Sequence, residues 1–558
     1  MKNILSLILN LFLVSCILQG QRKKINLREE IFEDPILKST EIEYTKNNNI
    51  IELKSEHIIT QISWTKKEDY KFNYLLGIFE GSNDPSFSDA VPIAMIKDQA
   101  NLNEVNILDV NVPKFYKYIR YIPPNKNNTD ISPIKIYGQL QSELNLGGKN
   151  DFQVTNLPLI SIRTENSVFP TSKEVEINCK IIITNEGKIE TNEEATIRTR
   201  GKSTSMASDK KPYRIKFNTQ QQILGLKGTY KKWTLIANFY DKALMRNAIA
   251  FKISELMKFE YTPRCLPVDL ILNGDYRGNY YLCDQIEVGK NRINIDKMEK
   301  TDINEPNLSG GYFLEVDGGG SFYGYKSYKT DKGIQWTINY PQEEDIVQEQ
   351  INYITSKFNK FESEIYNGNY DSIDLDSYSK FFLVEEFCGD PDAVWSSLYI
   401  IKKRNDEKFY FGPVWDFDLG FDNDRRLTPT NDKPQFAFTY GASAGTMMDF
   451  TKTLIGQKTV INYIQKTWQK LCSSGFNENA LIDFIEQKKE EIKESSDLNY
   501  KKWDNFVKEK SPWDWGDMGG FGRNTESFEA GVERLKEYVK KRFSSLSNLI
   551  DKAVSQAK

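Results

Sequence analysis

Alternating apolar and polar positions from about residue 30 to 140 predict short strands separated by turns. β-rich runs lie at 58–64, 74–79, 116–122 and 134–137, and turn-forming residues gather at 81–85. Strands at such regular spacing are typical of an all-β sandwich. We therefore predict a β-sandwich over residues 30–140, followed by a linker at 141–157 that contains Gly147-Gly148.

The next region, from 157 to about 300, mixes strand patterns with one helical pattern. Strands are predicted at 195–201, 212–217 and 233–237, and a hairpin is predicted across Asn273-Gly274. Apolar residues at helical spacing predict a helix from Lys242 to Met257, with Asp241 as its candidate N-cap.

Helical periodicity dominates the rest of the chain. It covers most of 343–390 and returns over about 455–558. Between these parts, strands at 398–401 and 409–411 flank a polar turn and predict a second hairpin. The whole chain therefore belongs to the α+β class, with a β-sandwich first and a helical C-terminal region last.

The first twenty residues have the pattern of an export signal. Lys2 gives a positive start, and the stretch from Ile4 to Leu18 is nearly all apolar. We predict a cleaved signal peptide at 1–20 and a secreted or cell-surface protein. Leu13-Val14-Ser15-Cys16 also resembles a lipoprotein box, so lipid anchoring at Cys16 stays an alternative. No later run reaches the roughly 18 apolar residues of a transmembrane segment.

The amino-acid composition limits the kinds of binding and catalysis that this chain can carry out. Lys and Arg total 74 against 78 Asp and Glu, a net charge of −4, which argues against a general nucleic-acid binder. The single histidine is His57, so histidine-based zinc sites and Ser-His-Asp or Cys-His nucleophiles are excluded. Any catalysis must use carboxylates, Lys, Arg, backbone dipoles or a hard metal.

The cysteines do not form a disulfide framework. Beyond the predicted signal peptide, the widely spaced cysteines are Cys179, Cys265, Cys283, Cys388 and Cys472. Pairing of Cys265 with Cys283 and buried free thiols are both open at this point.

Two acidic segments flank the predicted hairpin of 398–411. Asp390 and Asp392 precede it, and Asp416 and Asp418 follow it. A hairpin brings its two ends together, so Asp392 and Asp416 are expected to be neighbours. Close carboxylates repel unless a cation or a proton lies between them, and oxygen ligands suit Mg²⁺ or Mn²⁺. Asp-rich turns without a chemical role are the alternative interpretation.

A cationic cluster lies upstream. Arg198, Arg200 and Lys202 alternate and so share one face of a strand, and Lys210, Lys211, Arg214 and Lys216 follow. Such groups can clamp a triphosphate, Arg through a bidentate fork and Lys as a point charge. A solvated basic face that pairs with acidic surface residues is the alternative.

Seven segments stand in the order found in the spore-coat-protein-H (CotH) kinase family, which the chain resembles over about 158–545. They are IRTRGKST at 197–204, KPYRIKF at 211–217, KWTLIAN at 232–238 with Asp241, NGDYRGNY at 273–280, GGYFLEVD at 310–317, 392–402, and GPVWDFD at 412–418. The region 30–140 resembles the discoidin or galactose-binding-like (F5/8 type C-like) jelly roll, through FEGSND at 79–84 and the strands at 118–121 and 134–138.

The first resemblance implies an atypical, two-lobed protein-kinase-like fold. It further implies transfer of the ATP γ-phosphoryl group to Ser or Thr of extracellular or surface proteins, with Mg²⁺ or Mn²⁺. By position, Asp392 matches the catalytic Asp, Asp416 matches the metal-binding Asp, and Asp418 assists it. The residues it points to for nucleotide binding are Arg198, Arg200, Lys216, Lys402 and Trp415. The jelly-roll resemblance implies a glycan or surface partner.

Two positions depart from the family pattern, namely Lys202 in place of Asn and Asp422-Asn423 in place of Gly-Asn. These departures leave room for an altered metal preference or a degraded activity. The family includes surface adhesins, so a non-catalytic adhesion or scaffold protein is the first alternative. A carbohydrate-active hydrolase with Asp392 and Asp416 as its acid–base pair is the second, although it gives the cations no task.

Overall fold

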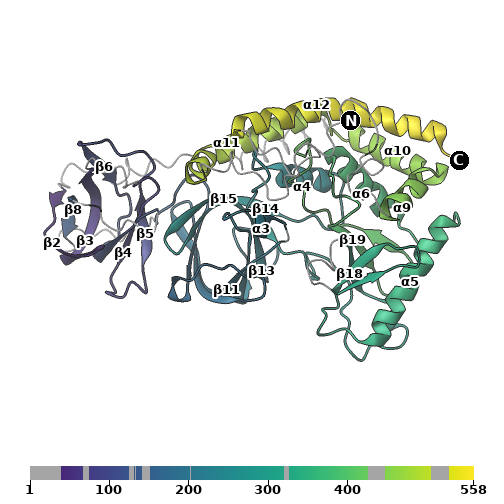
Figure 1. Ribbon diagram of the computed structural model, residues 1–558, viewed down its shortest axis with the longest axis horizontal. Helices are drawn as coiled ribbons and strands as arrows, with labels where there is room; N and C mark the ends of the chain where they lie inside the picture. The colour runs from purple at the N-terminus through teal and green to yellow at the C-terminus, as the bar shows by residue number, and fades with distance from the viewer. Residues whose placement is uncertain are drawn as a thin grey trace, which may run out of the picture.

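The computed structural model describes residues 39–66, 74–124, 131, 133–140, 151–201, 203–318, 326–424, 436, 446–503 and 527–558. The predicted signal peptide with Cys16, the first part of the predicted linker, and Lys202 lie outside these residues. Over the described ranges, a β-sandwich, a barrel and a mixed α/β region follow one another along the long axis of the molecule (Figure 1). The α+β class is therefore confirmed.

The N-terminal part is all-β, as predicted. Its central strand, β3, is long enough to pair with β8, β7, β6 and β2 in turn. A strand expected at 74–79 begins only at Ile78, because the Gly77 N–H donates to the Tyr74 carbonyl and Leu76 takes a left-handed φ of 68°. The strands are β1 (Thr40–Glu41), β2 (Tyr44–Asn47), β3 (Ile50–Thr65), β4 (Ile78–Ser82), β5 (Val91–Met95), β6 (Val105–Asp109), β7 (Phe115–Ile122) and β8 (Ile134–Leu140).

The second part is a closed barrel. Its strand order is β10-β11-β12-β13-β15-β14-β9, and the parallel pairing of β14 with β9 completes the closure. Alternate residues such as Ile181, Ile197, Ile215 and Leu270 fill the interior and are fully buried. The strands are β9 (Leu159–Thr164), β10 (Ile177–Asn185), β11 (Lys188–Thr199), β12 (Tyr213–Gln221), β13 (Tyr230–Ile236), β14 (Cys265–Leu272) and β15 (Asp275–Asp284).

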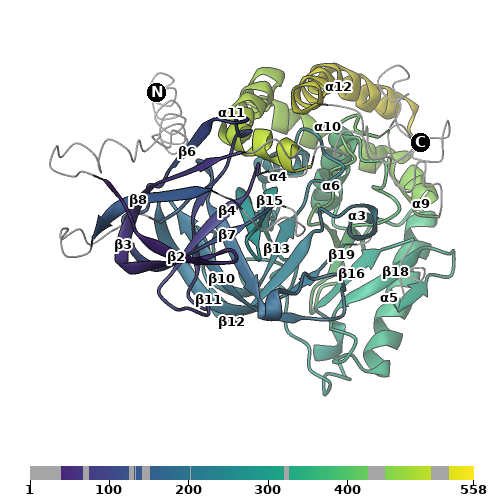
Figure 2. The same cartoon turned by 60° about the vertical axis from the view of Figure 1, so that its left-hand side comes forward.

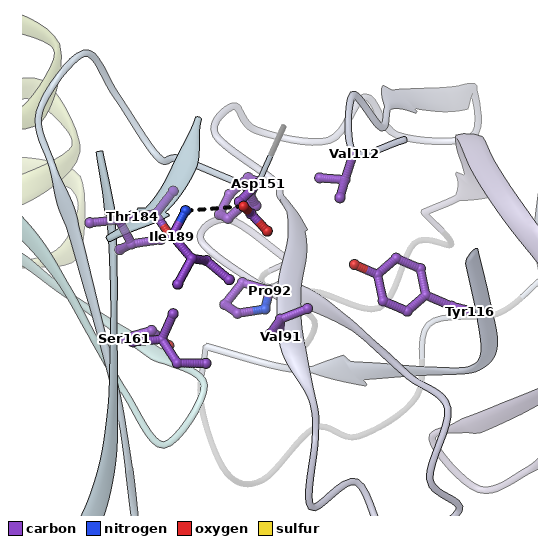
Figure 3. A pocket seen from close by; sticks show the side chains of 11 residues that line it. Val91, Pro92, Val112, Tyr116, Asp151, Ser161, Thr184 and Ile189 are labelled. Atoms are coloured by element: carbon purple, nitrogen blue, oxygen red, sulfur yellow. Dashed lines mark hydrogen bonds between the residues drawn. The ribbon is translucent and has the colours of Figure 1, made fainter. Parts of the chain in front are cut away.

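The sandwich packs directly against the barrel. Glu80 of β4 is buried and accepts hydrogen bonds from Arg120 of β7 at 2.5 Å and from Arg163 of barrel strand β9 at 2.6 Å. Figure 3 shows a small, mostly apolar pocket between the two parts, where the Ile189 N–H donates to Asp151 at 3.1 Å. Residues 151–157 of the predicted linker therefore lie within a packed boundary between the two parts.

The third part combines a sheet with helices. Its sheet has the order β17-β18-β16-β19-β20. The hairpin predicted at 398–401 and 409–411 is confirmed as β19 and β20. The strands are β16 (Tyr312–Val316), β17 (Ser327–Lys329), β18 (Gln335–Tyr340), β19 (Leu398–Lys402) and β20 (Phe409–Phe411). The helices are α3 (Ser203–Ala207) and α4 (Arg246–Leu256) in the barrel region, followed by α5 (Gln348–Tyr366), α6 (Leu375–Cys388), α9 (Thr446–Ile455), α10 (Lys458–Ser473), α11 (Glu478–Lys502) and α12 (Phe528–Gln556).

Helices α11 and α12 lie side by side over the barrel and the mixed region (Figures 1 and 2). The Asn279 N–H of β15 donates to the Asn499 side chain of α11 at 3.2 Å, which fixes α11 to the barrel wall. Within the ranges described above, no helix combines the length and the apolar character that a membrane crossing requires.

Helix α4 starts later than predicted. The expected helix from Lys242 to Met257 begins at Arg246, because the Asp241 carboxylate accepts the N–H groups of Ala243 and Arg246 and holds the preceding residues in a turn. Leu244 within this turn has a left-handed φ of 57°. Asp241 is therefore not the N-cap, which is Met245, but lies five residues before the first helical residue and accepts its N–H.

Candidate functional site

The open end of the β19–β20 hairpin joins two loops. The Gly412 N–H donates to the Tyr399 carbonyl at 2.9 Å and extends the ladder beyond β20. Just past it, the Ser397 hydroxyl donates to an oxygen of Asp416 at 3.5 Å. The loop that leaves β20 therefore runs next to the loop that enters β19.

A second hydrogen bond joins the other ends of the same two loops. Helix α6 ends at Gly389, whose φ of 60° turns the chain into Asp390. The Phe421 N–H donates to the Cys388 carbonyl at 2.5 Å. Hydrogen bonds at both ends thus hold the two acidic segments predicted from the sequence next to each other.

Six carboxylates of these segments interact electrostatically, and we call them the acidic cluster: Asp241, Glu385, Asp390, Asp392, Asp416 and Asp418. Burial, followed by the negative charges of Asp416, Asp241, Asp390 and Asp392, raises the pKa of Asp418 well above its ordinary value. Burial, followed by the charges of Asp390, Glu386 and Asp416, does the same to the pKa of Glu385. Asp392 and Asp416 therefore both lie within electrostatic reach of Asp418.

The turn that carries Asp416 has a strained backbone, which hydrogen bonds with buried side chains hold in place. Asp416 has a φ of 75°, a region that residues other than glycine rarely adopt, and it is exposed. The Phe417 N–H donates to the Asn247 side chain of α4 at 2.9 Å. The Asn423 side chain donates to the carbonyls of Asp418 at 2.6 Å and Tyr240 at 2.8 Å. Two buried amides thus hold this backbone in place.

A buried cationic group borders the cluster at Asp241. The guanidinium of Arg246 donates to the Asp241 carboxylate, and both side chains are fully buried. The Nε and Nη2 atoms of Arg246 have no hydrogen-bond acceptor among the described residues. Lys210 and Lys242 are also fully buried. Burial, then the charges of Lys242 and Arg277, lowers the pKa of Lys210, while Asp241 opposes this shift.

Sequence reasoning did not single out Arg246 or Lys242 for this site, and it placed Lys210 only in the general cationic cluster. The available signal was the spacing from Asp241 to Arg246, which brings a carboxylate and a cation together at the start of a helix.

Among the predicted nucleotide-binding cations, Arg200 contacts Trp415, the residue before Asp416. Its guanidinium lies 5.5 Å from the ring centre of Trp415, a cation–π geometry. Trp415 is buried and stacks on Phe251 with the rings 5.6 Å apart. The charges of both Arg200 and Asp416 act on the buried Tyr399 hydroxyl. Burial and then Glu315 raise the pKa of Tyr399, Arg200 lowers it, and Asp416 raises it.

Arg198 and Lys216 lie beside an acidic residue, Glu176, that is not part of the acidic cluster. Inward-facing Ile197 and Thr199 are buried in the barrel, so Arg198 points outward. Arg198 and Lys216 lie 4.0 and 3.9 Å from the Glu176 carboxylate. The alternative of a basic face paired with an acidic residue therefore describes Arg198 and Lys216.

Lys402 has a structural position, contrary to the expectation that it contacts a nucleotide. Its ammonium is buried and donates to the carbonyls of Ser309 and Lys403 at 3.1 Å each, and to the Asp406 carbonyl. It stands at the turn end of β19, about 13 Å along the strand from Leu398 at the open end.

The donor set suits a hard cation. Within the described ranges, no three His, Cys, Asp or Glu side chains converge into a ready-made metal cage. Mg²⁺ needs no such cage, because it usually binds through one or two carboxylates plus water and substrate phosphates. A buried oxygen of Glu385 also lacks a hydrogen-bond partner among the described residues. Asp416 and Asp418 are carboxylates, the donor type that Mg²⁺ and Mn²⁺ prefer.

A cavity of about 320 Å³ lies elsewhere, beside Phe259, Ser377, Lys403 and Tyr410. None of the residues of the acidic cluster lines it. This cavity is therefore separate from the acidic cluster.

Comparison with known proteins places the chain in a family. A search of curated proteins finds no match. Among solved structures, the N-terminal region is similar to the CBM62 module of Clostridium thermocellum Xyl5A, with 29% identity over 17% of this chain and 71% of that chain and a TM-score of 0.16.

The family model described as CotH kinase protein matches residues 197–546. This range starts at IRTRGKST, the first of the seven segments named in the sequence analysis, and contains the barrel strands from Ile197 onward, the acidic cluster and helix α11. The chain therefore belongs to the CotH kinase family.

Proposed function

We propose that this protein is a secreted, atypical Ser/Thr protein kinase that transfers the γ-phosphoryl group of ATP to secreted or surface proteins. The observation that carries the proposal is the position of Arg200 and Trp415 next to Asp416, at the same hairpin end as Asp392. Family membership supports it.

The proposed chemistry needs no histidine. Phosphoryl transfer depends on positioning and on neutralising charge, and both are available from carboxylates, Arg and a divalent ion. When bound, Mg²⁺ or Mn²⁺ would neutralise charge on the phosphate oxygens, with Asp416 and Asp418 as its protein ligands. A nearby cation would also stabilise the ionised form of Asp418 against the burial and the negative charges that raise its pKa.

Asp392 has the role of orienting the acceptor hydroxyl and receiving its proton. It is half-buried, and its carbonyl accepts the N–H groups of Trp395 at 2.8 Å and Ser396 at 3.1 Å, so its loop forms a hydrogen-bonded turn. Arg200 is assigned to bind the phosphate oxygens, because its guanidinium lies beside Trp415, next to the metal-binding Asp416. Arg246 is a positioning residue that holds Asp241 beside the cluster.

The N-terminal sandwich is proposed to bind a glycan or a surface partner. Since Glu80 and Arg163 join it to the barrel, such a ligand would be held at a fixed place relative to the kinase region. Export by the signal peptide, or lipid anchoring at Cys16, would bring the enzyme to its substrates.

The test is incubation of the purified protein with γ-labelled ATP, Mg²⁺ or Mn²⁺ and candidate surface proteins. Label transfer is expected for the wild type and is expected to be lost in Asp416→Asn and Asp392→Asn. Nucleotide binding with Mg²⁺ should weaken only in Asp416→Asn. Asp376→Asn is the matched control, because this exposed residue of α6 stands outside the cluster.

Absence of both label transfer and nucleotide binding with either metal would contradict the kinase proposal and favour an adhesion or scaffold protein. Hydrolysis of a glycan that is lost in both cluster variants would favour the hydrolase instead.

A further inference from the structure

Two cysteines face each other across the barrel wall. Strands β14 and β15 are antiparallel, and their register places Cys265 directly opposite Cys283. Residues directly opposite each other point to the same side of a sheet, so both thiols share one face.

The type of pair brings the two residues close. The Asp284 N–H donates to the Arg264 carbonyl at 3.0 Å, so Arg264 and Asp284 form a hydrogen-bonded pair. Hydrogen-bonded and non-hydrogen-bonded pairs alternate along an antiparallel ladder, which makes Cys265 and Cys283 a non-hydrogen-bonded pair. Their Cα atoms then stand about 4.5 Å apart, within the range that a disulfide spans.

The thiols differ in access. Cys283 is fully buried, whereas Cys265 at the start of β14 is partly exposed. The Cys265 side chain lies close enough to contribute to the raised pKa of the Cys283 thiol. The other described cysteines lie on β10, α6 and α10, away from this strand pair.

We propose that Cys265 and Cys283 form a cross-strand disulfide when the protein meets a small-molecule disulfide oxidant. Cys265, as thiolate, attacks one sulfur of the oxidant and releases one thiolate, which takes up a proton. Cys283 then loses its proton and attacks the Cys265 sulfur of the mixed disulfide, which releases the second thiol. The protein loses two electrons and two protons, and the oxidant gains both to give two thiols.

This disulfide is consistent with the proposed export, because disulfides persist in oxidising compartments. It does not depend on kinase activity. Burial first, and then Cys265, raises the pKa of Cys283, while the charge of Arg200 opposes the shift, so the strand pair also lies within electrostatic reach of the proposed nucleotide site.

The experiment follows the thiols of the full chain. Reduced protein is incubated with excess oxidised glutathione, quenched with N-ethylmaleimide under denaturing conditions, digested and analysed by mass spectrometry. The expected product is a Cys265–Cys283 cross-linked peptide, with Cys179, Cys388 and Cys472 still alkylated. The oxidised wild type should also show a higher Tm than the reduced form, and this increase should be absent in Cys265→Ser but present in Cys472→Ser.

Repeating the incubation in urea below the unfolding transition opens the strand pair transiently, so that burial of Cys283 no longer limits the reaction. Alkylation of both residues after this treatment, or glutathione retained on Cys265 without the cross-link, would overturn the proposal. Loss of kinase activity would not, since the peptide readout is independent of phosphotransfer.

Discussion

The Asn247 side chain of α4 accepts the backbone N–H of Phe417 at 2.9 Å. Through this bond a helix of the barrel region fixes the turn that carries Asp416, whose φ of 75° is unfavourable for a residue with a Cβ atom. The bond therefore joins the barrel to the acidic cluster and holds Asp416 in a conformation that the turn would not adopt readily by itself.

Replacing Asn247 by Leu should impair catalysis. The substitution removes the acceptor and leaves the Phe417 N–H buried and unsatisfied, at a cost of about 1–3 kcal/mol. We expect label transfer to fall more than the loss of folded protein explains, because Asp416 is displaced. The measurements are the phosphotransfer rate and urea unfolding. Asn352→Leu, on the exposed face of α5, is the matched control. Unchanged transfer by a folded Asn247→Leu would contradict the positioning role.

The cations of the barrel should separate into two groups. Arg200→Gln is expected to weaken ATP binding about 10- to 100-fold, the effect of losing a charge-assisted hydrogen bond of roughly 1.5–3 kcal/mol. Lys216→Gln should leave ATP binding unchanged, because Lys216 faces Glu176 on the outer barrel surface. Calorimetric titration with an ATP analogue and Mg²⁺ measures both. Equal effects of the two substitutions would contradict this division.

Local sequence patterns predicted the hairpin and its acidic ends well. Strands β19 and β20 are short and separated by a polar turn, so their pairing depends on neighbouring residues only. The barrel was not predicted, because its closure pairs β9 with β14 across more than a hundred intervening residues. Alternation within β11 was visible in the sequence, but the side that faces solvent is fixed only once the barrel closes.

Charged residues were the hardest to place. Lys402 ends an apolar strand and looks like a free cation in the sequence, yet the Ser309 carbonyl from a distant segment and the Asp406 carbonyl from the adjacent hairpin turn enclose it. Arg246 belongs to a predicted helix, where a charged side chain is normally expected to be exposed. Its full burial results from Asp241, which supplies the opposite charge at the start of the helix.

A buried carboxyl in the barrel wall should make stability depend on pH. Asp269 of β14 is fully buried and accepts hydrogen bonds from the hydroxyls of Thr155, Tyr276 and Ser495. Burial raises its pKa from 3.8 to about 6, and these hydroxyls oppose the shift. Between these pH values the native state binds more protons than the unfolded state, so this group makes the free energy of unfolding fall as pH rises, by about 3 kcal/mol in total.

Urea unfolding from pH 4 to pH 7 tests this dependence. Asp269→Asn should remove the decrease that the carboxyl causes, whereas the exposed control Asp345→Asn should follow the wild type. An identical pH profile for wild type and Asp269→Asn would mean that Asp269 is not the source of the dependence.

Glu80 should control whether the sandwich and the barrel unfold together. Its buried carboxylate binds both Arg120 in its own sheet and Arg163 in the barrel. Glu80→Gln leaves the two cations without their counter-charge, at a cost of about 3 kcal/mol, at the low end for a broken buried pair because both Arg side chains are partly exposed. Calorimetry is expected to show a separate, lower-temperature transition for the sandwich, and limited proteolysis should release it. Glu52→Gln, an exposed residue of β3, should leave one transition, and the same single transition in Glu80→Gln would show that apolar packing alone joins the two parts.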